Sequence, residues 1–452
     1  MQRHFIFSAI MLMVGLQTHS QILPTETLPQ ILPQITDPVQ RAAAQAQQRV
    51  LQQHKLTQQL AEKAALPDPL TVLPQTLEVL NQSGEVRWRE VEVEHGFRAI
   101  EREWLLLVSI SEWQQLIARW PQVPALVQSE DHLEALGLRL VNIKVPAELD
   151  SATALDHKLK TELTTLAGRN HVYQPQLALS NEQSTSANDR AAMCNIPVTL
   201  GMVDTAIALG HPALQQQSGQ LTIAQHNFLP ADMAQSYGHG TAIAGVLAGQ
   251  HNNSPLLPQL HLYSAGAFYP SNLYQQSATL SHIVKALNWL ASEQVTVINM
   301  SLTGPDNPVL AAVVRQLAAQ QIILVAAAGN GGPAAAPLFP AAYADVLAVT
   351  AVDQQLQLYR WANQGDYIDF AAPGVKVSAL RAGGDVAAQS GTSIATPVVS
   401  AAIACLRAQQ PTITLAQIRQ RLIAQARDLG GQGKDPQFGY GLIAAPLKTE
   451  LK

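Results

Sequence analysis

The chain has 452 residues, which at roughly 150 residues per domain predicts about three units. Charged residues make up 13% of it, and 28 Lys and Arg against 33 Asp and Glu give a net charge of −5. This charge-poor, mildly acidic chain lacks the basic stripe that phosphate backbones require, so we expect no nucleic acid as its main partner. Its 47% hydrophobic content can bury a core and excludes a wholly disordered chain.

The first 20 residues have the features of a secretory signal peptide. Arg3 and His4 form a short polar start, and residues 5–16 are apolar. Thr18 and Ser20 place small residues at positions −3 and −1 of a cut. The alternative, a membrane anchor, needs about 20 apolar residues to span a bilayer, and this run is far shorter. We therefore expect an exported protein, secreted or periplasmic, without stable membrane insertion.

Residues 21–85 are expected to form a Pro- and Gln-rich linker that contains one helix. The helical part is residues 39–66, where Ala, Gln, Leu, Lys and Glu dominate and apolar residues recur at rough helical spacing. The apolar stripe is thin, which favours a solvated helix over a coil that binds a partner.

Residues 86–179 are expected to fold as a small α/β unit that resembles a split βαβ sandwich. The predicted strands are 98–109, 123–127, 138–145 and 171–179. The predicted helices are 111–120, capped by Ser111, and 151 to about 166. The following segment, residues 180–194, begins with a polar run and is predicted to be an exposed linker in which proteolytic processing occurs.

Residues 195–452 alternate between strands and helices. The predicted strands are 198–203, 260–264, 295–300, 322–327 and 346–352. The predicted helices are 239–248, 280–292, 309–320, 393–409 and 415–425. Near-continuous apolar strands between helices indicate an α/β fold with a mainly parallel sheet that helices cover on both faces.

The chain has two cysteines, Cys194 and Cys405. In an exported protein an even number of cysteines permits one disulfide, but two buried free thiols would also fit. The sequence leaves these alternatives open. Two cysteines alone do not supply the four ligands of a usual structural metal site.

Three short motifs place an acid, a base and a nucleophile at loop ends. Asp204 ends a predicted strand, at the edge where catalytic groups of parallel sheets gather. His239 lies between two glycines at a helix start, and Ser393 begins another helix in the run Ser390-Gly-Thr-Ser-Ile-Ala-Thr-Pro397. A serine becomes an effective nucleophile when a histidine takes its proton and a carboxylate orients that histidine.

A fourth motif ends the strand at 322–327 in the run Ala326-Ala-Ala-Gly-Asn330-Gly. An asparagine amide at this position can donate a hydrogen bond to a developing oxyanion.

These motifs resemble those of the subtilisin-like serine protease family, in which the catalytic residues also follow in the order Asp, His, Ser. The resemblance covers about residues 195–446 and extends to the runs Val297-Ile-Asn-Met-Ser-Leu302, Asp369-Phe-Ala-Ala-Pro-Gly374 and Phe438-Gly-Tyr-Gly441. It implies that Asp204 orients His239, that His239 is the general base and then the acid, and that Ser393 forms the acyl-enzyme. Asn330 and the Ser393 backbone N–H would hold the oxyanion.

The resemblance also implies the substrate-binding residues of an enzyme that acts on proteins or peptides. The strand that pairs with substrate would be formed by Ser301, Leu302, Thr303 and Gly304. The pocket for the residue before the scissile bond would be bordered by Ala327, Ala328 and Gly329. Thr303 departs from the glycine that is frequent in the family. No charged group lines this pocket, so we expect it to favour medium-sized apolar side chains.

By the same resemblance, residues 86–179 would be a pro-domain that inhibits the enzyme until it is cut. We expect a monomer that requires no cofactor. Family members often bind calcium for stability, but no Asp-rich loop here identifies calcium ligands. Two alternatives stand beside the protease. A binding protein on a decayed protease fold would have lost Asp, His or Ser, and all three are present; an ester-cleaving acyl hydrolase would use the same triad.

Overall fold

The computed structural model describes residues 75–159, 166–175, 178–179, 191–215, 220–250, 255–272 and 275–447. The predicted signal peptide, the predicted helix at 39–66 and residues 180–190 lie outside this part of the chain. Within it, no helix has both the length and the apolar character that a bilayer crossing demands.

Residues 75–175 form a small unit in which an antiparallel sheet packs against two helices. Its strands are β1 (Thr76–Leu80), β2 (Val86–Glu92), β3 (Arg98–Val108), β4 (Val127–Leu133), β5 (Leu138–Lys144) and β6 (Leu166–Pro175), and its helices are α2 (Ile110–Arg119) and α3 (Ala152–Leu159). Strand β3 pairs antiparallel with β2, β5 and β6. Along β3, Leu106 and Val108 pack with α2 and α3, whereas Leu105 and Leu107 join the core of the large unit. This alternation is the two-residue period of a strand.

The small unit differs from its sequence prediction in several elements. The predicted strand 123–127 is wrong, because Val123–Leu126 is a 3-10 helix; β2 was not predicted as a strand, and β6 begins at Leu166 rather than at residue 171. Strand β1 lies in the predicted linker, where it pairs with β2 as a hairpin. Strand β4 has polar residues at most positions and pairs only with β5, so it lacked the apolar alternation of a half-buried strand. Helix α2 is capped by Ser109 rather than Ser111, because Glu112 completes a capping box with Ser109.

Residues 191–447 form a large unit built on a seven-stranded sheet. The strands follow in the order β17 (Ile368–Pro373), β16 (Val346–Val352), β15 (Ile323–Ala327), β13 (Val297–Met300), β8 (Val198–Asp204), β10 (Leu260–Gly266) and β9 (Thr222–Asn227). Every neighbouring pair is parallel. The predicted mainly parallel sheet is therefore confirmed.

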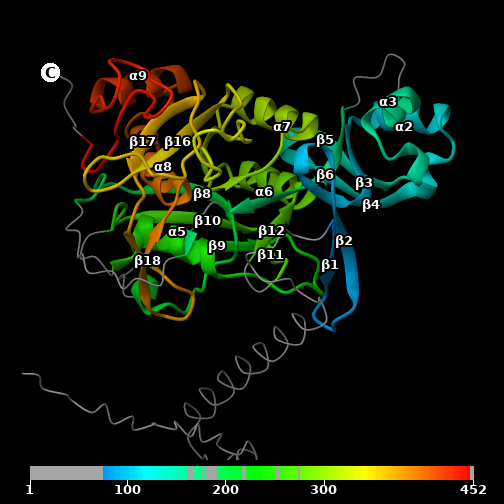
Figure 1. Cartoon of the computed structure of the whole chain (residues 1–452), viewed down its shortest axis with the longest axis horizontal. Coiled ribbons are helices and arrows are strands. Elements are labelled where there is room, and N and C mark those ends of the chain that lie inside the picture. Colours follow the sequence, from blue (N-terminus) through cyan, green and yellow to red (C-terminus); the bar gives the residue numbers. More distant parts are fainter. Residues whose placement is uncertain are drawn as a thin grey trace, which may run out of the picture. The chain divides into compact units, whose positions relative to one another are not determined.

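Helices cover both faces of this sheet, as predicted. Helices α5 (Gly238–Ala248) and α8 (Thr392–Gln409) share one buried cluster, and α6 (Leu280–Ser292) and α7 (Pro308–Ala319) share another. In β15, Val325 belongs to the first cluster and Leu324 to the second, which shows that the two faces alternate along the strand. Figure 1 shows the sheet with α5 and α6 on opposite sides of β8 and β10. Helices α4 (Pro212–Gln215) and α9 (Leu415–Gln425) add Leu214, Ile418 and Leu422 to the first cluster.

Several further strands are short, and some of them join the end of the small unit to the large one. They are β7 (Ala178–Leu179), β11 (Tyr269–Pro270), β12 (Gln276–Thr279), β14 (Leu302–Thr303), β18 (Val377–Leu380) and β19 (Val386–Ser390). Strand β6 pairs antiparallel with β12 and with β14, and β7 pairs antiparallel with β19. Helix α7 also contacts β6, and Figure 1 shows the two side by side.

Cys194 and Cys405 form a disulfide, with Cα atoms 6.1 Å apart. This answers the question that the sequence left open. The bond links the segment before β8 to the second half of α8, two elements that are 211 residues apart in the chain.

Candidate active site

Asp204 and His239 form a buried pair at the carboxyl end of the sheet. Asp204 is the last residue of β8, and His239 is the second residue of α5. The Nδ1 atom of His239 lies 2.7 Å from Oδ1 and 2.9 Å from Oδ2 of Asp204. Both side chains are 2% exposed. A carboxylate can only accept in this contact, so Nδ1 is the donor and Nε2 is the ring nitrogen that can accept a proton.

Thr205 fixes the helix that carries this histidine. Its backbone N–H donates to Asp204 Oδ1 at 2.7 Å, and its hydroxyl accepts from the Gly240 N–H at 2.7 Å. A Cβ atom at Gly240 would lie 2.3 Å from the Thr205 carbonyl oxygen. Only glycine permits this close approach, which explains why a glycine follows the histidine. The sequence analysis did not single out Thr205.

Ser393 is the second residue of α8 and is fully buried. Helix α8 contacts both α5 and β8, so the elements that carry His239, Asp204 and Ser393 adjoin one another. The Nε2 atom of His239 is buried and has no hydrogen-bond partner in the part of the chain that the structure describes. A buried, basic nitrogen in this state can accept a proton from a hydroxyl group.

Asn330 lies against the residue before Ser393. Its Oδ1 accepts hydrogen bonds from the backbone N–H and from the hydroxyl of Thr392, each at 3.0 Å. The same Thr392 hydroxyl accepts from the Gly329 N–H at 3.2 Å. Because Oδ1 is engaged by two donors, the orientation of the amide is fixed. Thr392 is a further site residue that sequence reasoning missed.

Strand β14 contains Leu302 and Thr303, which were predicted to bind substrate. Both residues pair with β6 of the small unit, Leu302 with Pro175 and Thr303 with Gln174. The following residue, Gly304, forms an antiparallel bridge with Phe339, which brings Phe339 next to the end of β14. Ser301 has a different environment: its hydroxyl donates to the Ser393 carbonyl oxygen at 2.9 Å.

Tyr173 of β6 fills a buried space beside β14. The side chain is fully buried in the cluster that contains α6 and α7. Its hydroxyl donates to the Pro305 carbonyl at 2.9 Å. A Cβ atom at Gly304 would lie 2.3 Å from the Tyr173 ring, so glycine provides the space for the aromatic group. Burial raises the pKa of Tyr173 well above its ordinary value, so this hydroxyl stays a donor.

Ala327 is the last residue of β15, and Ala328 and Gly329 follow it. Ala327 and Ala328 are fully buried. Gly329 has φ +114°, and a Cβ atom there would lie 2.8 Å from Leu338. A non-glycine residue would therefore be strained at this turn.

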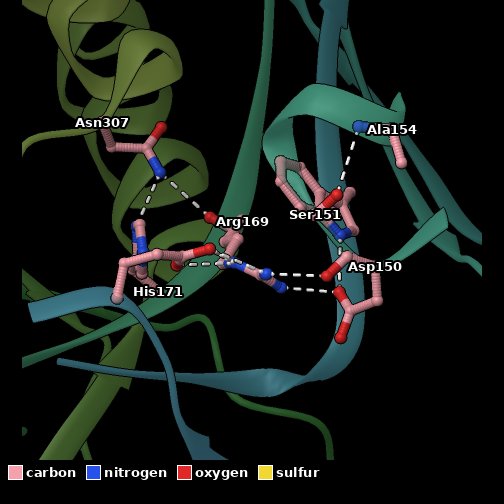
Figure 2. Close-up of polar contacts among 8 residues, drawn as sticks. Asp150, Ser151, Ala154, Arg169, His171 and Asn307 are labelled. Carbon is pink, nitrogen blue, oxygen red and sulfur yellow. Dashed lines mark hydrogen bonds and ion pairs between the residues drawn. The ribbon is translucent and has the colours of Figure 1, made fainter. Parts of the chain in front are cut away.

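A polar network ties β6 to the start of α7 (Figure 2). Asn307 caps α7 through a bond from the Val309 N–H to its Oδ1, and its Nδ2 donates to the Arg169 carbonyl and to Nδ1 of His171. Arg169 in turn binds Asp150 and Glu94. Burial, followed by the nearby Arg169 charge, lowers the pKa of His171 to about 4, so the ring is neutral near pH 7.

Comparison with known proteins agrees with this geometry. The model of the subtilase family matches residues 196–441, which is more than half of the chain. The chain belongs to the subtilase family. The match covers the large unit and includes all four motifs of the site.

Curated relatives are bacterial proteases. The chain is 31% identical over 258 residues to the minor extracellular protease Epr of Bacillus subtilis, which is 56% of this chain and 39% of that protein. It is 33% identical over 256 residues to subtilisin E of Bacillus subtilis, covering 54% of this chain and 64% of the relative. The chain thus spans less than two thirds of the length of either relative. An alkaline protease of Alkalihalobacillus alcalophilus is 28% identical over 357 residues, 75% of this chain and 88% of the relative.

Proposed function

We propose that this subtilase is an exported serine endopeptidase made as a zymogen. The observation that carries the proposal is the buried contact of 2.7 Å between His239 Nδ1 and Asp204, which leaves the opposite ring nitrogen ready to take a proton. The names of the bacterial relatives, which include extracellular and alkaline proteases, support the same activity.

In the proposed reaction Ser393 Oγ attacks the peptide carbonyl carbon while its proton passes to Nε2 of His239. Asp204 stabilises the imidazolium that forms. The Asn330 amide and the Ser393 N–H donate hydrogen bonds to the oxyanion. His239 then gives its proton to the leaving amine, which breaks the C–N bond and leaves an acyl-enzyme. A water molecule then attacks the ester carbonyl carbon while His239 takes its proton. His239 returns this proton to Ser393 Oγ as the acyl C–O bond breaks, which releases the acid product and frees Ser393.

The proposed substrates are extended protein or peptide segments that pair with β14. Strand β6 supplies the support, because it is an extended segment of the same chain and pairs with Leu302 and Thr303 in an antiparallel register. A strand added at a sheet edge uses backbone hydrogen bonds, so many sequences can bind. The uncharged residues Ala327, Ala328 and Gly329 support a preference for apolar side chains before the cut.

Residues 75–175 would then be the pro-domain, and β6 would block the substrate edge. Strand β6 ends at Pro175 on β14, and β7 begins at Ala178 beside Ser390, three residues before Ser393. These two contacts lie on elements next to the predicted site, since β14 directly follows Ser301 and β19 ends three residues before Ser393. We therefore place the processing cut between Pro175 and Ala178, upstream of the predicted linker at 180–194.

The proposed chemistry needs no cofactor, since its steps use only groups of the chain, the substrate and water. Among the described residues no three His, Cys, Asp or Glu side chains gather as metal ligands. A calcium site for stability stays a proposal without named ligands. Export and a monomeric state are likewise part of the proposal.

Incubation of the purified chain with casein tests this function. We expect peptide products and a new amino-terminus at residue 176, 177 or 178, and neither with Ser393→Ala. Hydrolysis of simple esters without cleavage of casein would favour the acyl hydrolase instead. Binding of casein without hydrolysis by the unaltered chain would favour a non-catalytic binding protein.

A further inference from the structure

We propose that the β1–β2 hairpin is a second anchor of the pro-domain on the large unit. The hairpin binds the segment that leads to the helix of His239, and this contact delays release of the pro-domain after the cut. The inference rests on the proposed zymogen function. The first anchor is β6, which lies at the substrate edge. The hairpin contacts a different part of the large unit, residues 229–233 and β11, and Figure 1 shows it extending from the sheet of the small unit.

Aromatic and apolar side chains form the centre of the hairpin contact. The ring of Trp88 meets that of Tyr269 edge to face, with centroids 5.1 Å apart. Val79 of β1 is buried with Tyr269, Leu229 and Met233 in a cluster separate from the main cores. Edge-to-face aromatic pairs at the centre of an interface contribute more than their buried area alone. Release of the hairpin would expose these apolar side chains to water.

The turn of the hairpin adds polar contacts to the same segment. The Gln82 N–H donates to the Asp232 carbonyl at 2.8 Å, and its Nε2 donates to the Met233 carbonyl at 2.9 Å. Arg87 lies 3.2 Å from the Asp232 carboxylate in an exposed ion pair. The Asn81 side chain accepts from Ser83 and Glu85 within the turn, which fixes the shape that meets residues 232 and 233.

A buried carboxylate joins the hairpin to Tyr269. Glu90 accepts from the Tyr269 hydroxyl at 2.9 Å and pairs with Arg98 at 3.4 Å. Burial raises the pKa of Glu90, whereas the bonds from Tyr269 and Arg98 oppose that rise. A buried carboxylate needs hydrogen-bond donors. Separation of the two units would remove the Tyr269 hydroxyl, which is the donor that the large unit provides to Glu90.

The segment that the hairpin contacts leads directly into α5, the helix that carries His239. It runs from the end of β9 at Asn227 to Tyr237, the residue before α5, and His239 follows two residues later. The hairpin therefore holds residues that enter the catalytic helix without touching the triad. A cut between Pro175 and Ala178 would sever the chain at β6 and leave this contact intact.

Onset of activity in the full-length chain tests the anchor. We expect Trp88→Ala to leave the rate of the first cut, measured on gels, unchanged. It should shorten the lag before casein hydrolysis by about tenfold, since a central interface aromatic typically has an effect of this size. Arg89→Ala is the matched control, because Arg89 lies on the same strand, is exposed and binds Glu78 within the hairpin. Its lag should equal that of the unaltered chain.

A second variant covers the case in which Trp88→Ala does not fold. Gln82→Ala removes one hydrogen bond from an exposed residue and should shorten the lag about two- to tenfold. A lag unchanged in Gln82→Ala, or in a folded Trp88→Ala, would overturn the anchor.

Hydrogen exchange in the uncut Ser393→Ala chain provides a readout that needs no enzyme activity. Adding Trp88→Ala should raise exchange at residues 229–236 about tenfold, and adding Arg89→Ala should not. Equal exchange in all three chains would contradict the anchor even if the protein is a protease. Faster exchange with Trp88→Ala in a chain that never cuts casein would contradict the protease and support the contact.

Discussion

The hydroxyl of Ser301 donates a hydrogen bond of 2.9 Å to the backbone carbonyl of Ser393. In a regular helix this carbonyl would accept from the N–H of the residue four positions later, but that residue is Pro397, which has none. Asn299 donates to the Ser301 hydroxyl and accepts from Ser400, so a buried chain of side chains replaces the missing helical bond.

Ser301→Ala should therefore impair the enzyme through the position of Ser393. The change leaves a buried carbonyl without its donor, at a cost of about 1–3 kcal/mol. We expect a lower unfolding temperature and a lower kcat with an unchanged pH profile. Ser292→Ala, which removes an exposed hydroxyl at the end of α6, is the matched control and should alter neither quantity. Equal stability of the two variants would contradict the role of Ser301.

Asn330→Ala should lower kcat by about 10²–10³, the magnitude found for the oxyanion asparagine of a subtilisin. Thr392→Val removes the hydroxyl that orients Asn330 but keeps the backbone N–H donor, so a smaller loss, about three- to tenfold, is expected. Steady-state kinetics on one peptide substrate would measure both. If Thr392→Val were as active as the unaltered enzyme, the orientation of Asn330 would not depend on this hydroxyl.

A substrate that pairs with β14 as β6 does would place one side chain where Tyr173 lies. Gly304→Ala should weaken binding of substrates with an aromatic side chain at that position. The added methyl group would lie 2.3 Å from that ring, which the fully buried site cannot relieve without a shift. We expect kcat/KM for a peptide with Tyr at this position to fall at least tenfold relative to the same peptide with Ala. Gly210→Ala meets no atom within 4 Å and serves as the control. An unchanged ratio of kcat/KM between the Tyr and Ala peptides would show that the substrate tyrosine does not bind where Tyr173 lies.

Acid should loosen the contact between β6 and α7. His171 has a pKa of about 4 in the folded chain and an ordinary value of 6.5, so the unfolded state binds more protons between these pH values. The charges that face the ring are Arg169, Glu94 and Asp306. The stabilisation from neutral His171 is complete above pH 6.5 and is lost as the pH falls towards 4.

Urea unfolding of the Ser393→Ala precursor at pH 7 and pH 5 measures this effect. The contribution of His171 to the unfolding constant should change by at most about tenfold per pH unit within the window. His171→Gln should reduce the pH dependence, although His282, with a pKa lowered to about 3 by burial, still contributes. An identical pH dependence in the two chains would exclude His171 as a source.

The disulfide should stabilise the large unit. A closed loop of 211 residues corresponds to about 5 kcal/mol in the chain-entropy estimate, which is an upper bound. Cys194→Ser should therefore lower the free energy of unfolding by about 2–5 kcal/mol. Calorimetry on the Ser393→Ala background, which avoids self-digestion, would measure the change. Two free thiols in denatured, unreduced protein would contradict the bond.

The sequence by itself determined the sheet, the family and the four loop-end motifs. A continuous apolar strand such as 346–352 indicates a sheet that is covered on both faces. The histidine between two glycines at a helix start, His239, is a motif that can be recognised in the local sequence alone. Polar edge strands such as β4 and β9 carried no such signal, because their residues face solvent or one neighbour only.

Only the tertiary structure decided which distant residues meet. Local pattern does not encode the pairing of β6 with β14, the approach of Trp88 to Tyr269 or the bond from Ser301 to Ser393, because each joins segments more than 90 residues apart. The same holds for Cys194 and Cys405, which the sequence allowed to bond but could not bring together. The last two contacts form within the large unit, whereas the first two join the small unit to the large one, and it is through these two that we expect the proposed zymogen to be controlled.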